Sequence, residues 1–285
     1  LELFHGPTLA FKDVAMQLLA RLMDAELARR GERVTIVGAT SGDTGSAAIE
    51  AFRACQRVDV FILYPHGRVS DVQRRQMTTV DAPNVHALAI DGTFDDCQAL
   101  VKAMFNHAAF RDRVRLSGVN SINWARIAAQ VVYYFTSAAA LGAPHRPVSF
   151  AVPTGNFGNV LAGWIARRMG LPMERLVIGT NANDILARVL ADGEAALTTV
   201  TPTSSPSMDI QVSSNFERLI FEASGRDAAR VRGMMASLGQ SGRFELGDIA
   251  AKVRAEFRAA AGSEADVNGC ITRIKAQSGY VLDPH

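Results

Sequence analysis

Cysteine is scarce in this sequence, and the three residues present, Cys55, Cys97 and Cys270, lie far apart. An odd number of cysteines at such spacings fits neither a disulfide framework nor a zinc site, so we expect a reducing compartment such as the cytoplasm. The six histidines show no metal-ligand spacing. No metal ion is therefore expected.

Neither an excess of charge nor a long apolar run is present. The 30 basic and 28 acidic residues leave a net charge of +2 and are scattered, unlike the clustered basic residues of nucleic-acid-binding proteins. No apolar run reaches the roughly 18 residues that a membrane-spanning helix needs. We therefore expect neither nucleic acid nor a membrane as a partner.

The length of the chain allows a substantial core. Its 285 residues, 48% of them hydrophobic, are enough for one large or two modest domains. The chain begins at Leu1, already inside a motif, and stops at His285 without a terminal helix or polar tail. We therefore expect it to be an internal part of a longer protein.

Apolar stretches with little polar alternation are separated by stretches with helical periodicity. The former predict strands at residues 34–37, 58–64, 85–90, 148–152 and 176–179. The latter predict helices at residues 9–30, 47–54, 70–80, 94–107, 123–141 and 160–169. Strands of this kind joined by helices indicate an α/β fold with a parallel sheet covered on both faces. After a Ser-, Thr- and Pro-rich loop, more helices are expected at residues 216–223, 228–238, 249–260 and 267–277.

One lysine lies among apolar and small residues where a helix is predicted to begin. Lys12 follows Pro7 and Thr8, which favour helix entry. Apolar neighbours and the positive end of the helix dipole both disfavour the charged amine and lower its pKa from about 10.4. A neutral amine is what a Schiff-base lysine requires. A lysine directed to solvent from a first helical turn is the alternative, and for an arbitrary helix it is the commoner case.

Two loops follow the carboxyl ends of predicted strands. Ligands bind at these ends in parallel α/β sheets. The first loop, residues 39–45, reads Ala-Thr-Ser-Gly-Asp-Thr-Gly. Its small residues, hydroxyls and N–H groups at a helix start suit an anion. A tight turn with Asp43 or Thr44 as the helix N-cap fits the same residues equally well.

The second loop, residues 153–159, reads Pro-Thr-Gly-Asn-Phe-Gly-Asn. Two glycines and two asparagines at a helix N-terminus are typical of a phosphate-binding loop. Neither loop has the glycine spacing of G-x-G-x-x-G or the lysine of a P-loop, so both standard nucleotide motifs are absent. The polar residues of 120–123, which precede a predicted helix, are interpreted as helix caps and not as ligand contacts.

Four motifs in this order resemble the threonine synthase family, which are fold-type II enzymes dependent on pyridoxal phosphate. They are residues 5–13 (His-Gly-Pro-Thr-Leu-Ala-Phe-Lys-Asp), 40–45, 120–123 and 153–159. Residues 212–218 and 283–285 also resemble that family, so the likeness covers essentially the whole chain. It implies a three-layer parallel-sheet fold like that of tryptophan synthase β, with additional helices toward the C-terminus. The expected organisation is a cofactor-binding α/β region at 1–193, with a smaller sub-domain at about 30–140 inserted in it, and a mostly helical continuation at 194–285.

The resemblance also implies roles for individual residues. Lys12 would hold the cofactor, pyridoxal 5'-phosphate, covalently and act as a general base. The cofactor phosphate would be bound by Gly155, Asn156, Phe157, Gly158 and Asn159. The carboxylate or phosphate of the substrate would be held by Ser41, Gly42, Asp43 and Thr44.

The implied reaction converts O-phospho-L-homoserine and water to L-threonine and phosphate by γ-elimination and β-addition of water. The enzyme would be cytoplasmic and either a monomer or a homodimer. Asp43 favours this reaction over that of serine or threonine dehydratases and cysteine synthases, several of which have asparagine there. A threonine synthase-like phospholyase is a second alternative. A non-catalytic Rossmann-like binding module is an alternative of a different class, which the missing nucleotide motifs disfavour.

Overall fold

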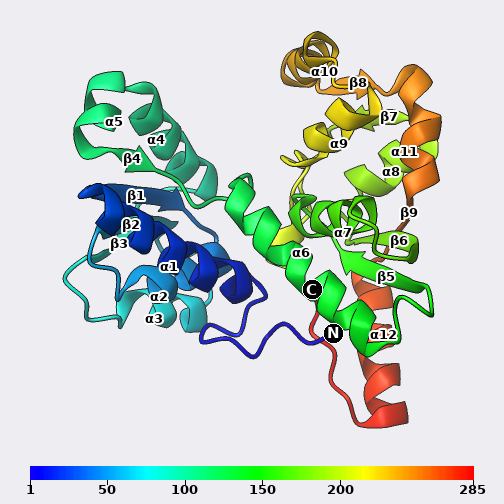
Figure 1. The fold of residues 1–285 in the computed structure, drawn as a ribbon, viewed down its shortest axis with the longest axis horizontal. Coiled ribbons are helices and arrows are strands. Elements are labelled where there is room, and N and C mark those ends of the chain that lie inside the picture. Colours follow the sequence, from blue (N-terminus) through cyan, green and yellow to red (C-terminus); the bar gives the residue numbers. More distant parts are fainter. The chain divides into compact units, whose positions relative to one another are not determined.

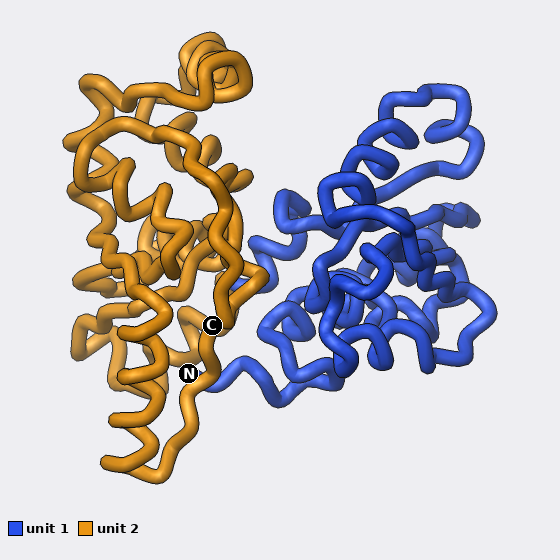
Figure 2. The backbone as a smooth tube through the Cα atoms, turned by 180° about the vertical axis from the view of Figure 1, so that it is seen from behind, with its two compact units in different colours: residues 1–130 blue, residues 131–285 orange.

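The computed structural model describes every residue from Leu1 to His285, and the chain forms two compact units, residues 1–130 and 131–285 (Figure 2). The boundary that the sequence predicts between residues 193 and 194 therefore falls inside the second unit. The proposed division of the whole protein at that residue stays a prediction. Each unit has its own sheet.

The first unit is built on a four-stranded parallel sheet with the order β3-β2-β1-β4 (Figure 1). Its strands are β1 (Val34–Ala39), β2 (Val58–Pro65), β3 (Val85–Ile90) and β4 (Leu116–Ser117). Its helices are α1 (Lys12–Arg30), α2 (Asp43–Phe52), α3 (Asp71–Thr78), α4 (Phe94–Asn106) and α5 (Ala108–Val114). The main core joins α1 and α2 to the sheet, whereas α4 packs on β1 and β2 around a second, smaller apolar cluster. Because the strands are parallel, the loop after β1 lies at the edge where ligands bind in such sheets.

The second unit contains a parallel sheet with the order β5-β6-β9 and a small antiparallel pair, β7-β8. Its strands are β5 (Val148–Pro153), β6 (Met173–Thr180), β7 (Glu194–Ala196), β8 (Arg243–Glu245) and β9 (Phe257–Ala261). Its helices are α7 (Gly158–Arg168), α8 (Ile185–Asp192), α9 (Phe216–Ala223), α10 (Ala228–Ser241), α11 (Ala250–Glu256) and α12 (Glu264–Ser278). Two short 3₁₀ turns, η1 (Pro206–Met208) and η2 (Gly247–Ile249), complete it. Helix α6 (Trp124–Ala140) runs across the division at residue 130.

The expected α/β class, with parallel strands connected through helices, is confirmed. Ser70 caps helix α3, because its hydroxyl accepts a hydrogen bond from the Gln73 N–H at 3.3 Å. Gly31 ends α1 in the left-handed conformation with φ +70°. Helix α1 begins at Lys12 and not at Leu9, because Leu9 itself has φ +60° and its N–H closes a turn on Gly6. No helix in the structure is both long and apolar enough to cross a membrane.

The helix expected at 249–260 is wrong in its second half. Helix α11 stops at Glu256, and Phe257–Ala261 forms β9, which pairs in parallel with β6. Three consecutive alanines favour a helix by intrinsic propensity. Pairing with β6 and burial of the Phe257 ring, which is 2% exposed, override that propensity.

Candidate active site

Lys12 is the first residue of α1, and its position is fixed by the turn that precedes it. The Asp13 carboxylate, which is 1% exposed, accepts hydrogen bonds from the N–H of Thr8 at 2.9 Å and from its hydroxyl at 2.6 Å. A side chain at Gly6 would overlap that of Asp13, so glycine is required there. This turn directs Lys12 inward, where only 8% of the residue is exposed.

The Lys12 amine is hydrogen-bonded to a carboxylate of the 39–45 loop. Its Nζ lies 2.7 Å from Oδ2 of Asp43. The other carboxylate oxygen of Asp43 accepts a hydrogen bond from the side-chain amide of Gln73 on α3. The same helix also holds the turn before Lys12, because the Gln76 amide donates to the Thr8 carbonyl at 3.1 Å.

Burial has the largest effect on the pKa of Lys12. Desolvation of the charged amine lowers the pKa of Lys12 below its ordinary value, while the charge and hydrogen bond of Asp43 raise it. The positive charge of Arg126 lowers it further, and the net shift is downward. The direction agrees with the expectation from the sequence, although burial is the largest cause.

Arg126 was not selected from the sequence as a functional residue, and the structure makes it a strong candidate. The residue is 4% exposed, and burial lowers the pKa of its guanidinium to about 10. One of its terminal nitrogens donates to the Val119 carbonyl at 2.9 Å, but Nε has no acceptor and no carboxylate forms an ion pair with it. A buried cation without a counterion is suited to an anionic ligand. The signal in the sequence was its isolation, since Arg126 is the only charged residue in α6.

The loop after β1 is shaped by Thr40 and Gly42. The Thr40 hydroxyl accepts hydrogen bonds from the N–H groups of Gly42 and Gly45, each at 2.9 Å. Gly42 precedes α2 with φ +146°, a conformation that side chains rarely adopt, and the Gln73 side chain fills the space where its Cβ would lie. The alternative with Asp43 or Thr44 as N-cap is wrong, because Gly42 occupies that position without a side-chain bond. Asp43 is thus available to Lys12.

The 120–123 segment has the structural role that the sequence indicated. The Asn123 side-chain oxygen accepts a hydrogen bond from the Ala125 N–H at 3.0 Å, and its amide donates to the Gly118 carbonyl at 3.2 Å. Asn123 thereby caps the start of α6. This cap also fixes the first turn of the helix that carries Arg126.

The loop at 153–159 connects β5 to α7 in the second unit. Phe157 has φ +64°, is 1% exposed, and packs edge-on against Phe216 and Phe257 with ring centroids 5.3 and 5.5 Å away. Gly155 approaches the backbone of Met208 so closely that an added Cβ would lie 3.1 Å from its Cα. The loop backbone is therefore held by packing on both sides.

The segment 212–215 secures the same loop by hydrogen bonds. The Ser213 hydroxyl donates to the Gly155 carbonyl at 2.8 Å. The backbone and side-chain amides of Asn215 both donate to the Asn156 carbonyl, at 3.1 and 3.0 Å. Ser213 and Asn215 of the 212–218 stretch therefore have a structural role in holding the loop.

The donors that remain at the start of α7 fit a phosphate group. The cap residue Phe157 offers no side-chain acceptor, and the first turn contains no acidic residue. The leading N–H groups of a helix have no intrahelical partners, and together with the helix dipole they favour an anion. Gly155, Asn156, Phe157, Gly158 and Asn159 are therefore suited to the phosphate of pyridoxal phosphate.

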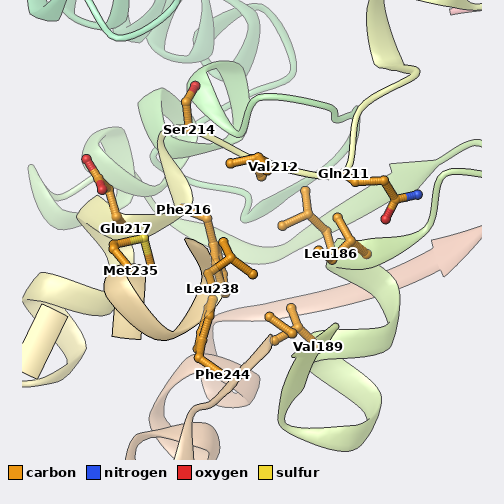
Figure 3. A pocket seen from close by; sticks show the side chains of 13 residues that line it. Leu186, Val189, Gln211, Val212, Ser214, Phe216, Glu217, Met235, Leu238 and Phe244 are labelled. Atoms are coloured by element: carbon orange, nitrogen blue, oxygen red, sulfur yellow. The ribbon is translucent and has the colours of Figure 1, made fainter. Parts of the chain in front are cut away.

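The second unit also has an apolar pocket that the sequence did not indicate. It lies among α8, α9 and α10 and is lined by apolar side chains that include Leu186, Val189, Phe216, Leu238 and Phe244 (Figure 3). Val212 and Ser214 form part of its wall. It contains none of the predicted site residues.

The structure therefore groups the predicted residues within each unit. In the first unit, Lys12 and Asp43 are bonded directly, and Gly42 shapes the loop beside them, whereas Ser41 is exposed and Thr44 is partly buried. In the second unit, the five residues of the 155–159 loop form one continuous helix entry.

Comparison with known proteins gives matches that cover most or all of the chain. Residues 1–261 match the family described as pyridoxal-phosphate dependent enzyme. The chain is 55% identical to the threonine synthase of Pseudomonas aeruginosa, covering all of this chain and 61% of that protein. The chain thus spans less than two thirds of the length of this relative.

Solved structures show the same likeness. The crystal structure of pyridoxal-phosphate-bound threonine synthase from Brucella melitensis has 63% identity and a TM-score of 0.96, covering all of this chain and 61% of the other. Threonine synthase from yeast has 44% identity and a TM-score of 0.92, covering all of this chain and 60% of the other.

Proposed function

The chain belongs to the family of pyridoxal-phosphate-dependent enzymes, and from this premise we propose that the whole protein is a threonine synthase. It would convert O-phospho-L-homoserine and water to L-threonine and phosphate. The observation that carries the proposal is the likeness to threonine synthases along the entire chain, including the buried Lys12. Its three unpaired cysteines suit a cytoplasmic enzyme.

The 155–159 loop is proposed to bind the phosphate of the cofactor through the N–H groups that begin α7. When bound, the cofactor supplies an electron sink for carbanion chemistry at the substrate. Packing of Phe157 and the hydrogen bonds from Ser213 and Asn215 keep the loop in one conformation. Such a preformed loop needs little reorganisation to bind the anion.

Lys12 is proposed to attach the cofactor and, once displaced by the substrate amine, to move protons. Its lowered pKa increases the fraction of neutral amine, which can accept the proton from Cα of the substrate and return it later. Asp43 cannot donate a hydrogen bond to an anion when it is ionised. The proposed role of Asp43 in the 39–45 loop is therefore to orient the Lys12 amine, with which it shares a hydrogen bond.

The leaving phosphate requires positive charge and hydrogen-bond donors. Arg126 provides a buried charge that no carboxylate neutralises. The hydroxyls of Ser41 and Thr44 are proposed to complete the substrate site, and Gly42, whose N–H is bonded to the Thr40 hydroxyl, shapes the loop that carries them. Groups of this kind lower the barrier most when they are fixed in advance, away from water.

We expect replacement of Asp43 by asparagine to move cofactor attachment to lower pH. Asp43 raises the pKa of Lys12 against the effect of burial, so its loss lowers that pKa further and leaves the amine neutral in more acidic solution. The measurement is the rate of the visible absorbance change when the cofactor-free full-length protein is mixed with pyridoxal phosphate at a series of pH values. Asp59→Asn, which removes a carboxylate paired with Arg33 at the surface, is the matched control. A midpoint that stays in place or rises in Asp43→Asn contradicts the assigned coupling.

Substrate comparison tests the proposed function. The full-length protein with pyridoxal phosphate is assayed for phosphate release and for the amino acid formed, using O-phospho-L-homoserine, O-phospho-L-threonine and L-threonine in parallel. We expect L-threonine from the first substrate and little turnover of the others. Preferential release of phosphate from O-phospho-L-threonine would instead identify a phospholyase, and deamination of L-threonine a dehydratase.

A further inference from the structure

The side chain of Asn159 is held by two neighbouring tyrosines of α6. The Tyr133 hydroxyl donates a hydrogen bond to Oδ1 of Asn159 at 2.6 Å. The Tyr134 hydroxyl lies 2.8 Å from the same oxygen and 3.0 Å from the backbone carbonyl of Asn159. Both donors therefore converge on one end of one residue in the 155–159 loop.

The tyrosines are built into the core. Tyr133 and Tyr134 are 7% and 2% exposed, and burial raises the pKa of both hydroxyls, so they remain protonated donors. The Tyr134 ring packs edge-on against Phe150 with centroids 4.9 Å apart. Gly163 on α7 leaves space for this ring, because an added Cβ there would lie 2.7 Å from it.

This arrangement determines which half of the Asn159 carboxamide is left for a ligand. A carboxamide oxygen has two acceptor sites, and here two hydroxyls occupy them. Both side-chain hydrogen bonds of Asn159 are made by Oδ1, which leaves the NH₂ group on Nδ2 for a ligand, and Asn159 is the second residue of α7. The donor half of the side chain is thus the half that remains at the helix N-terminus, where donors favour an anion.

We propose that Tyr133 and Tyr134 are positioning residues that orient the Asn159 carboxamide, so that its NH₂ group donates to the phosphate of the bound cofactor. The inference rests on the proposed function of the 155–159 loop. Without the hydroxyls the carboxamide can rotate and present its oxygen to the anion, which loses a donor and adds repulsion. Loss of one hydrogen bond to a charged group corresponds to a decrease in affinity of about 10- to 100-fold.

The test compares two ligands that differ only in the phosphate. Dissociation constants of pyridoxal phosphate and of pyridoxal are measured by absorbance titration of the full-length protein and of its Tyr133→Phe, Tyr134→Phe and doubly substituted variants. We expect the double variant to bind pyridoxal phosphate about 10- to 100-fold more weakly while its affinity for pyridoxal is unchanged. Tyr64→Phe removes a buried hydroxyl in the first unit and serves as the matched control.

A second measurement isolates the pathway through Asn159. In an Asn159→Ala background the tyrosine substitutions should have no further effect on the preference for pyridoxal phosphate, because the group that they orient is absent. The single tyrosine variants, each of which retains one hydroxyl on Oδ1, should show intermediate losses. They keep the test usable even if the double variant does not fold.

The outcomes separate the inference from the function on which it rests. If the unsubstituted protein prefers pyridoxal phosphate and the tyrosine variants keep that preference, the positioning role is overturned while the proposed function stands. If the tyrosine variants bind pyridoxal phosphate and pyridoxal more weakly by the same factor, the tyrosines only contribute to packing. That result also overturns the positioning role. If the unsubstituted protein binds both ligands equally, the assignment of the loop to phosphate fails.

Discussion

The Lys12→Ala variant is expected to lose covalent cofactor attachment and essentially all turnover. Removal of a general base alone costs about 10²–10⁴-fold in rate, and the same residue is also proposed to carry the cofactor. The burial and lowered pKa of Lys12 suit it to both tasks. The measurements are the visible absorbance of the full-length protein with pyridoxal phosphate and the rate of phosphate release from O-phospho-L-homoserine.

Two controls distinguish chemistry from folding in that experiment. Lys12→Arg retains a positive charge beside Asp43 but cannot attach the cofactor, so it should be as inactive as the alanine variant. Lys102→Ala removes an exposed lysine from α4 and should retain full activity. Turnover near the unsubstituted level in Lys12→Ala or Lys12→Arg would contradict the assignment of Lys12.

The Phe157→Ala variant is expected to lower the free energy of unfolding by about 3–5 kcal/mol, the usual cost of emptying a buried phenylalanine site. The ring is 1% exposed and joins the 155–159 loop to Phe216 and Phe257. The substitution also leaves a non-glycine residue with φ +64°, so backbone strain remains while packing is lost. Because the ring fixes the loop, the affinity for pyridoxal phosphate should fall as well.

Denaturant unfolding and cofactor titration of the full-length protein measure the two effects. Phe110→Ala on α5 is the matched control, because that ring is 40% exposed and its loss should change stability by no more than about 0.5 kcal/mol. Phe157→Leu, which retains most of the apolar volume, should lie between Phe157→Ala and the unsubstituted protein. A Phe157→Ala variant as stable as Phe110→Ala would show that the ring does not anchor the loop.

The long elements were predictable from the sequence because their patterns are strong. Strands β2 and β3 were expected at 58–64 and 85–90, and they occupy Val58–Pro65 and Val85–Ile90. Strands β4, β7 and β8 contain only two or three residues, too few to show any periodicity, and they were missed. Helices α5 and α8 were missed as well. Strand β9 was mistaken for helix because its alanines favour a helix, whereas pairing with β6 decides the outcome.

The candidate site divides in the same way. The reactive motifs could be recognised because each is a short contiguous run, such as residues 5–13 or 153–159. The partners that tune them come from distant positions: Gln73 reaches Asp43 from α3, and Tyr134 reaches Asn159 from α6. The local sequence around each motif contains no information about such long-range contacts. Arg126 was the exception, since an isolated charge in a long apolar helix could have been noticed.

Oxygen tracing tests the proposed reaction most directly. The full-length protein with pyridoxal phosphate turns over O-phospho-L-homoserine in water enriched in oxygen-18, and mass spectrometry locates the label. Elimination breaks the bond between Cγ and the ester oxygen, and water then adds at Cβ. We therefore predict one labelled oxygen in the hydroxyl group of L-threonine and none in the released phosphate. Label in the phosphate, with homoserine as the second product, would show hydrolysis at phosphorus and contradict the account.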